Sequence, residues 1–123
     1  MAVTEFLNVD LDLSTEGDIE ELLRYLGPSM LVMNQTANKL SIELRESHST
    51  VDQTITNLAE LISQLPAEGK EMWNRCDLRA FNVGIQAGDE PHQQYFTISS
   101  RAVAMLASIG SEVTFTVYVS AKP

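Results

Sequence analysis

The feature that most constrains the fold is that the spacing of apolar residues switches along the chain between strand and helix periods. Residues 7–13 place leucine or valine at every second position, which is typical of a strand with one buried face. Residues 19–26 repeat apolar side chains at helical spacing and end at Gly27, a residue suited to a helix C-terminus. Thr15, three residues before Asp18, resembles the start of a capping box. The chain therefore begins with a strand followed by a capped helix.

The same reading predicts the remaining elements. In chain order they are strands at 30–34 and 39–46 joined by a turn at 36–38, a helix from Ser49 or Thr50 to 65, a short helix after Pro66, strands at 78–86 and 95–98, a helix at 99–109 and a strand at 113–119. The inward stripe of the long helix is Val51, Ile55, Leu58, Ile62 and Leu65. Ser99 is expected to cap the last helix, and Gly110 to end it.

This order predicts an α+β fold, a mixed β-sheet with helices packed on one face, written βαββα then ββαβ. Segments 15–32 and 99–117 share one plan, in which a cap, an apolar helix, a glycine and a strand follow each other. Such a repeat favours a pseudo-duplicated, ferredoxin-like sandwich. The alternative is that these four common features recur by chance.

Length and cysteine content bound the class of protein. The 123 residues suit a single domain spanning 1–123 with one core. Cys76 is the only cysteine, and the N-terminal segment lacks a basic region followed by an unbroken apolar run, so we expect a chain of the reducing cytoplasm. Polar residues interrupt every apolar run well before the ~18 residues that a membrane span needs, so no membrane association is expected.

Charge is the outlier of the composition. There are 17 acidic and 8 basic residues, giving a formal net charge of −9. Such a surplus opposes the counterion release that supplies most nucleic-acid affinity, so no nucleic-acid partner is expected. It favours a basic protein partner through electrostatic steering. The alternative is that the charge serves solubility alone.

The sequence predicts no catalytic residue, no cofactor and no metal site. His48, His92 and Cys76 are far apart in sequence and lack the spacing of metal ligands. The chain has no GxSxG nucleophile elbow. Its six glycines are scattered singly, whereas a phosphate-binding loop needs them clustered.

Acidic residues and one tryptophan are the candidates for partner binding. The predicted partner-binding residues are Asp10, Asp12, Glu16, Asp18, Glu20, Glu21, Trp73, Asp89 and Glu90. The carboxylates fall on the polar face of the first strand, at the start of the first helix and in a loop. A solvated face is the plain alternative, and general acid–base work would need a cleft. Trp73 and Tyr95 suit interface anchors, with core packing as the alternative, whereas Phe81, Phe96 and Phe115 are expected in the core.

The order of elements also resembles a known family over most of the chain. The segments that carry the likeness are Asp12-Leu13-Ser14 with Ile19, Leu22-Leu23 and Leu26-Gly27; residues 40–47; the helix through Leu58, Leu61 and Leu65; and residues 96–99 with Leu106, Gly110 and the strand from Val113 to Val119. They look like domain of unknown function 4279. One departure is that the family places a tryptophan ahead of the junction at residues 40–47, whereas Trp73 lies downstream. The resemblance implies the fold and carries no catalytic residue.

Three classes of function follow. The first is a non-enzymatic binding protein, most simply a bacterial immunity protein or inhibitor that covers the active site of a basic toxin or effector. The second is a small-molecule or enzymatic domain whose site gathers Glu43, Arg45, His48 and Cys76. The third is a structural or regulatory homodimer in which the last strand, residues 112–121, pairs across a two-fold axis.

Overall fold

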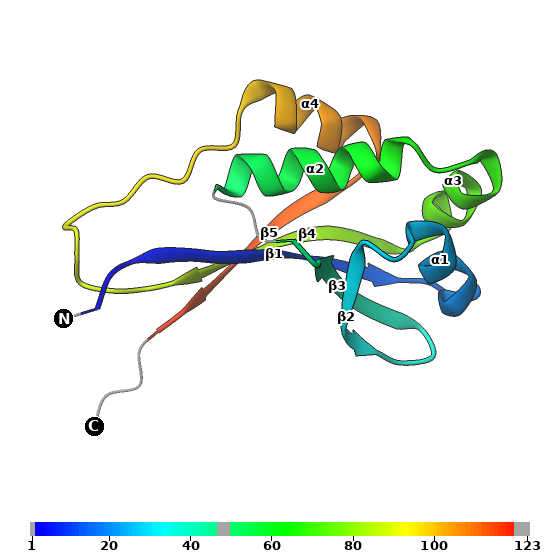
Figure 1. Cartoon of the computed structure of the whole chain (residues 1–123), viewed down its shortest axis with the longest axis horizontal. Helices are drawn as coiled ribbons and strands as arrows, with labels where there is room; N and C mark the ends of the chain where they lie inside the picture. Colours follow the sequence, from blue (N-terminus) through cyan, green and yellow to red (C-terminus); the bar gives the residue numbers. More distant parts are fainter. Residues whose placement is uncertain (1, 47–49, 120–123) are drawn as a thin grey trace.

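The computed structural model describes residues 2–46 and 50–119, and this part of the chain contains five strands and four helices (Figure 1). In chain order they are β1 (Glu5–Ser14), α1 (Ile19–Leu26), β2 (Met30–Gln35), β3 (Lys39–Leu44), α2 (Val51–Ser63), α3 (Ala67–Asn74), β4 (Leu78–Gln86), α4 (Ser100–Ser108) and β5 (Glu112–Tyr118). The predicted α+β class is confirmed, and so is the β2–β3 hairpin, whose turn closes through Thr36 and Lys39.

The sheet is mixed and has the order β2-β3-β1-β4-β5. All neighbouring pairs are antiparallel except β4 and β5, which are parallel. β1 is the central strand, so Leu11 faces Ile42 of β3 on one side and Phe81 of β4 on the other. Since β3 lies between β1 and β2, the unit β1-α1-β2 is a split βαβ arrangement.

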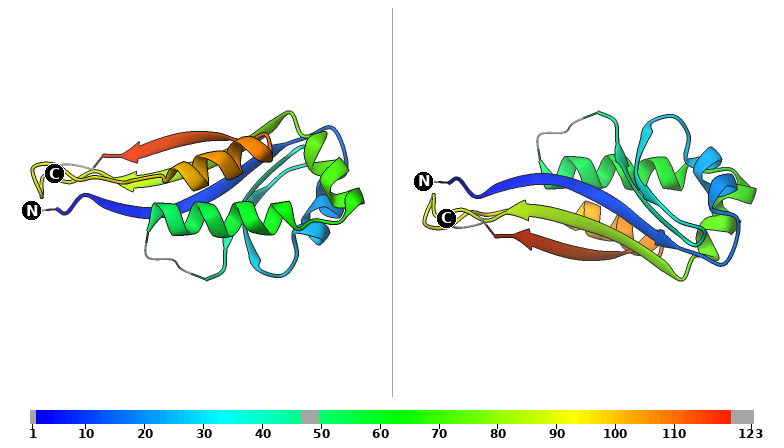
Figure 2. Two further views of the ribbon diagram at one scale, coloured as in Figure 1. Left: turned by 90° about the horizontal axis from the view of Figure 1, so that it is seen from above. Right: turned by 90° about the horizontal axis from the view of Figure 1, so that it is seen from below.

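The helices leave one face of the sheet uncovered. α2 and α4 lie side by side over one face, and α1 and α3 gather at one end of the sheet (Figures 1 and 2). The core lies beneath α2 and α4, where Leu11, Ile55, Leu58 and Phe81 are fully buried. We call the opposite side of the sheet the open face.

Local capping fixes where the helices begin. Thr50 and Ser99 accept hydrogen bonds through their side chains from the first turns of α2 and α4, as the sequence predicts. The cap predicted at Thr15 is wrong, because the carboxylate of Asp18 accepts from the Glu21 N–H and so caps α1. Thr15 is buried instead, and its hydroxyl accepts from the Gly17 N–H.

The strand predicted at 95–98 is wrong. Residues 93–99 form no strand, and Tyr95 is 78% exposed. Both sides of β4 are already occupied, by β1 and by β5, so no central position is left for this segment. Phe96 and Ile98 pack partly against the core, which accounts for the apolar pattern without a strand.

The predicted duplication is not confirmed. Gly27 and Gly110 both have positive φ, 87° and 67°, but Gly27 is itself the C-cap of α1, whereas Gly110 follows Ile109, the C-cap of α4. The strands that follow differ, because β2 pairs antiparallel with β3 whereas β5 pairs parallel with β4. The shared plan of the two segments is therefore local.

The last strand also departs from its predicted burial. Phe115, expected in the core, is 53% exposed, and Val117 and Val119 on the same side of β5 are 57% and 80% exposed. β5 is an edge strand, and only Val113 near its start packs against the core. The helix side of β5 therefore presents apolar side chains to solvent.

Gly88 holds the beginning of the chain against the end of β4. A Cβ at this position would lie 2.4 Å from the Ala2 carbonyl oxygen and 2.6 Å from the Val3 carbonyl carbon. We expect Gly88→Ala to lower the free energy of unfolding by about 1–3 kcal/mol, because backbone has to move. Gly17→Ala is the control, since its Cβ would meet only the Thr15 hydroxyl oxygen at 3.4 Å. Equal urea midpoints for the two variants would contradict this docking of residues 2–4.

Candidate functional site: the open face of the sheet

The open face is strongly acidic. Strand pairing places on it the carboxylates of Glu5, Asp10, Asp12, Glu43 and Glu112, and Lys39 is the basic residue that the described strands contribute to this face. These carboxylates come from β1, β3 and β5, so the charge extends across the sheet. Figure 2 shows this side from below, with the strands uncovered. The surface is broad and polar and is suited to contact with a large partner.

Asp12 is held rigidly at the centre of the open face. Its two carboxylate oxygens accept hydrogen bonds from the Ser41 hydroxyl at 2.8 Å and from the Asn82 amide at 3.1 Å. The Asn82 amide oxygen in turn accepts from the Thr116 hydroxyl at 2.7 Å. This network joins β3, β1, β4 and β5, so Asp12 is an oriented part of the sheet.

Asp10 and Glu43 form a close pair of carboxyl groups beside Asp12. Glu43 follows Ile42, which pairs with Leu11, so it lies across from Asp10. Burial, the hydrogen bond with Glu43 and the negative charges of Glu43 and Asp12 together raise the pKa of Asp10 to about 7. Asp10 therefore still holds its proton in a large fraction of molecules at neutral pH and ionises fully only above it.

The Asp10 pKa has a consequence for stability. Between the unfolded pKa near 3.8 and the folded value of about 7, only the folded state holds this proton, so raising the pH lowers the free energy of unfolding. Since Asp10 is partly solvated, we expect this contribution to be about 1 kcal/mol. Asp10→Asn should remove it and flatten the dependence across this window in urea titrations. Glu20→Gln, on exposed α1, should keep the wild-type slope, and equal slopes for all three proteins would contradict the assignment.

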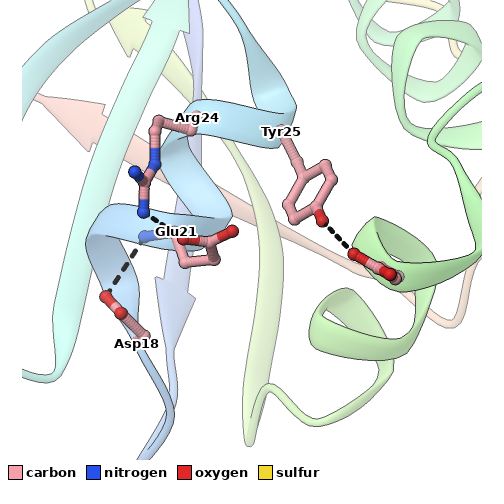
Figure 3. A network of polar contacts seen from close by, with 5 residues as sticks. Asp18, Glu21, Arg24 and Tyr25 are labelled. Atoms are coloured by element: carbon pink, nitrogen blue, oxygen red, sulfur yellow. Dashed lines mark hydrogen bonds and ion pairs between the residues drawn. The ribbon is translucent and has the colours of Figure 1, made fainter.

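The acidic residues predicted at the start of α1 lie at the end of the sheet. Two of them already interact with other groups of α1. Asp18 caps the helix, and Glu21 forms an ion pair with Arg24 (Figure 3). In the same figure Tyr25 donates a hydrogen bond at 2.5 Å to the Glu68 carboxylate of α3, which raises the pKa of Tyr25. The predicted residues Glu16 and Glu20 are exposed here.

Asp89 and Glu90 lie at the other end of the sheet. The Asp89 side chain accepts a hydrogen bond from the Ala2 N–H, and the Glu90 carbonyl accepts from the Thr4 N–H. The whole of β1 separates them from α1, which is roughly 30 Å at about 3.3 Å per residue. The predicted acidic residues therefore occupy three places, with Asp10 and Asp12 alone on the open face.

Trp73 is buried, with 2% of its surface exposed, so its predicted role as an interface anchor does not fit this structure. Its indole N–H donates to the Ile109 carbonyl at 2.8 Å, which ties α3 to the end of α4. The polar neighbours of Trp73 in sequence favoured a surface position. Its partner Ile109 lies 36 residues further along the chain, so the local sequence does not reveal this contact.

The residues considered for an enzymatic site do not gather. Glu43 lies on the open face, whereas Arg45 donates to the Pro28 carbonyl, and Cys76 is buried after α3. Burial raises the pKa of the Cys76 thiol, and a protonated thiol is a poor nucleophile. His48 lies outside the described residues.

The described ranges 2–46 and 50–119 contain neither a metal-binding cluster nor a membrane-spanning helix. No group of three or more His, Cys, Asp or Glu side chains there is arranged to hold a metal ion. No helix in this part of the chain is long and apolar enough to span a membrane.

Comparison of the chain with protein-family models, with curated proteins and with solved structures found no match. The resemblance to domain of unknown function 4279 therefore stays a prediction.

Several residues of the open face were not predicted as partner-binding. They are Glu5, Ser41, Glu43, Asn82, Glu112 and Thr116. The signal for each was its polar place in an alternating strand. The sequence does not show which strands are neighbours in the sheet, because strand pairing joins residues that are far apart along the chain.

Proposed function

We propose that this protein is a non-enzymatic binding protein that neutralises a basic toxin or effector by protein–protein contact, as an inhibitor or a bacterial immunity protein acting in the cytoplasm. The open face is the proposed contact surface. The observation that carries the proposal is its charge, five carboxylates against Lys39, on a sheet face that no described helix covers. Lysine and arginine side chains of a partner complement such a surface and are steered toward it.

The geometry of the face suits capture of cations. Asp12 is fixed by Ser41 and Asn82, so it loses little conformational freedom when a partner binds. Leu7 and Tyr118 flank Gly84 on the same face, and both are about half exposed. The charged centre of the face can orient a bound partner, and its apolar neighbours supply apolar surface that the partner buries.

Because of the Asp10 and Glu43 carboxyl pair, binding of this kind should depend on pH. A lysine or arginine placed between Asp10 and Glu43 favours the ionised form of Asp10 and displaces its proton. Affinity should therefore rise as the pH increases through about 7, and binding should release protons into the buffer. Asp10→Asn should remove this pH dependence.

The experiment that tests the proposal is affinity capture from the native host's lysate with the tagged chain. Columns are washed at about 0.05 M and about 0.3 M salt, because screening weakens contacts between exposed charges. We expect a basic protein at near-equal amount to the bait at low salt, and its loss at moderate salt. Recovery of the bait alone, or only of acidic proteins, would contradict the proposal.

A further inference from the structure

The geometry points to a second copy of this chain as the occupant of the β5 edge, in a two-fold dimer that continues the sheet from β5 to the β5 of its partner. Helix α4 is expected to pack against the α4 of the second copy above the new strand pair. This surface is the outer edge and the helix side of β5, whereas the open face lies on the opposite side of the sheet, and the inference does not depend on the proposed toxin partner.

The backbone of β5 presents hydrogen-bonding groups at the edge of the sheet. The Tyr118 carbonyl accepts from the Ala87 N–H, so the backbone groups of Tyr118 point toward β4. By alternation, the N–H and C=O groups of Val113, Phe115 and Val117 point outward at the sheet edge. β5 pairs with β4 without a register shift, whereas β2 at the other edge is interrupted at Val32/Asn34. Edge strands that must stay unpaired usually carry such bulges or charges.

The side chains beside this edge form an apolar surface. Phe115 and Val117 lie on the helix side of β5, each more than half exposed. Figure 2 places α4 between α2 and β5 in the view from above. Ser108 lines a groove with Ile62 and Ser63 of α2, so the opposite flank of α4, with Val103, faces the β5 edge. Val103 is 54% exposed and adds to the apolar surface.

The low charge of this surface favours a second copy of the chain as its occupant. Residues 102–119 carry a single charge, that of Glu112, although the chain as a whole has 20% charged residues and a net charge of −9. A second acidic copy is repelled from the rest of the surface and least repelled here. A basic partner would be drawn instead to the open face. The uncharged strip from α4 to β5 therefore fits a copy of the same chain.

The sequence of β5 is also self-complementary. Residues 113–117 read Val-Thr-Phe-Thr-Val, which is symmetric about Phe115, the middle residue of β5. Antiparallel pairing centred on Phe115 places Phe115 against its copy, Val113 against Val117 and Thr114 against Thr116. Aromatic, β-branched and threonine pairs of this kind stabilise antiparallel strands. The two-fold axis therefore passes through Phe115.

Cysteine cross-linking tests this register. Thr114 and Thr116 of opposite copies form a non-hydrogen-bonded pair, with Cα atoms about 4.5 Å apart, within disulfide range. In a Cys76→Ala background, Thr114→Cys and Thr116→Cys with different tags should give few cross-links separately. After co-refolding as a mixture, about half of the chains should enter a mixed disulfide dimer under mild oxidation. Cross-linking of Thr116→Cys alone, or none in the mixture, would overturn this register.

Sedimentation measures the dimer itself. We expect the wild type to move from monomer to twice the monomer mass with rising concentration, and added salt to leave or strengthen the dimer, because it screens the repulsion between acidic copies. Phe115→Glu should weaken association at least tenfold while keeping the monomer's circular dichroism. A wild type that stays monomeric at millimolar concentration, or a dimer unaffected by Phe115→Glu, would overturn the inference. The basic-partner complex has the opposite salt dependence, so the two proposals fail separately.

Discussion

Replacing Phe81 by alanine should lower the free energy of unfolding by about 3–5 kcal/mol, whereas the same change at Phe115 should cost less than about 1 kcal/mol. Phe81 is fully buried at the centre of the sheet, between Leu11 of β1 and Val113 of β5. Its removal leaves a cavity that the surrounding strands and helices cannot close. Phe115 lies on the neighbouring strand with 53% of its surface exposed, so truncation there loses little buried area.

The comparison of the two phenylalanines is made by urea denaturation at a protein concentration low enough to keep the chain monomeric. Both variants delete the same atoms from adjacent strands, so differences in β-propensity largely cancel. Similar losses at the two positions would contradict the edge position of β5. They would also mean that Phe115 is buried, whereas the dimer inference requires Phe115 to be exposed.

Leu58→Ala should lower the free energy of unfolding by about 2–5 kcal/mol. Leu58 is fully buried on the stripe of α2 that packs on the sheet. Leu61→Ala, one turn away on the same helix, is the matched control, because helix propensity changes equally while Leu61 is only partly buried. We expect less than half the loss at Leu61. Equal losses in thermal or urea unfolding would mean that α2 is rotated from the orientation described.

What could be predicted from the sequence is local. The caps at Thr50 and Ser99, the glycine ends at Gly27 and Gly110 and the inward stripe through Leu58 all depend on residues a few positions apart. Their physical causes, an unpaired helix N–H or a positive φ, act within one turn of chain. Such features are confirmed almost position by position.

The failures share one cause, which is that partners distant in sequence decide the outcome. Residues 95–98 have strand-like spacing, yet β1 and β5 already flank β4. Phe115 has a core pattern, yet β5 is an edge strand without full cover. Trp73 has polar neighbours, yet it is buried and donates to Ile109, 36 residues further along the chain. Neither periodicity nor propensity encodes which elements meet.

The candidate site was predictable in part for the same reason. The alternation of β1 places Asp10 and Asp12 on a polar face. Their meeting with Glu43, Asn82 and Thr116 requires the order of all the neighbouring strands. The sequence therefore predicted acidic residues but merged three separate groups into one surface.

The most direct test compares capture by three forms of the chain at pH 8, which is above the pKa of Asp10 of about 7. The face variant carries Asp10→Asn and Glu43→Gln, and the control carries Glu16→Gln and Glu20→Gln at the α1 end of the sheet. Both remove two carboxylates, and both leave the Asp12 network intact. The account predicts that the wild type and the control retain the same basic protein at low salt, while the face variant retains at least about tenfold less. Equal retention by all three forms would contradict the claim that the open face binds the partner.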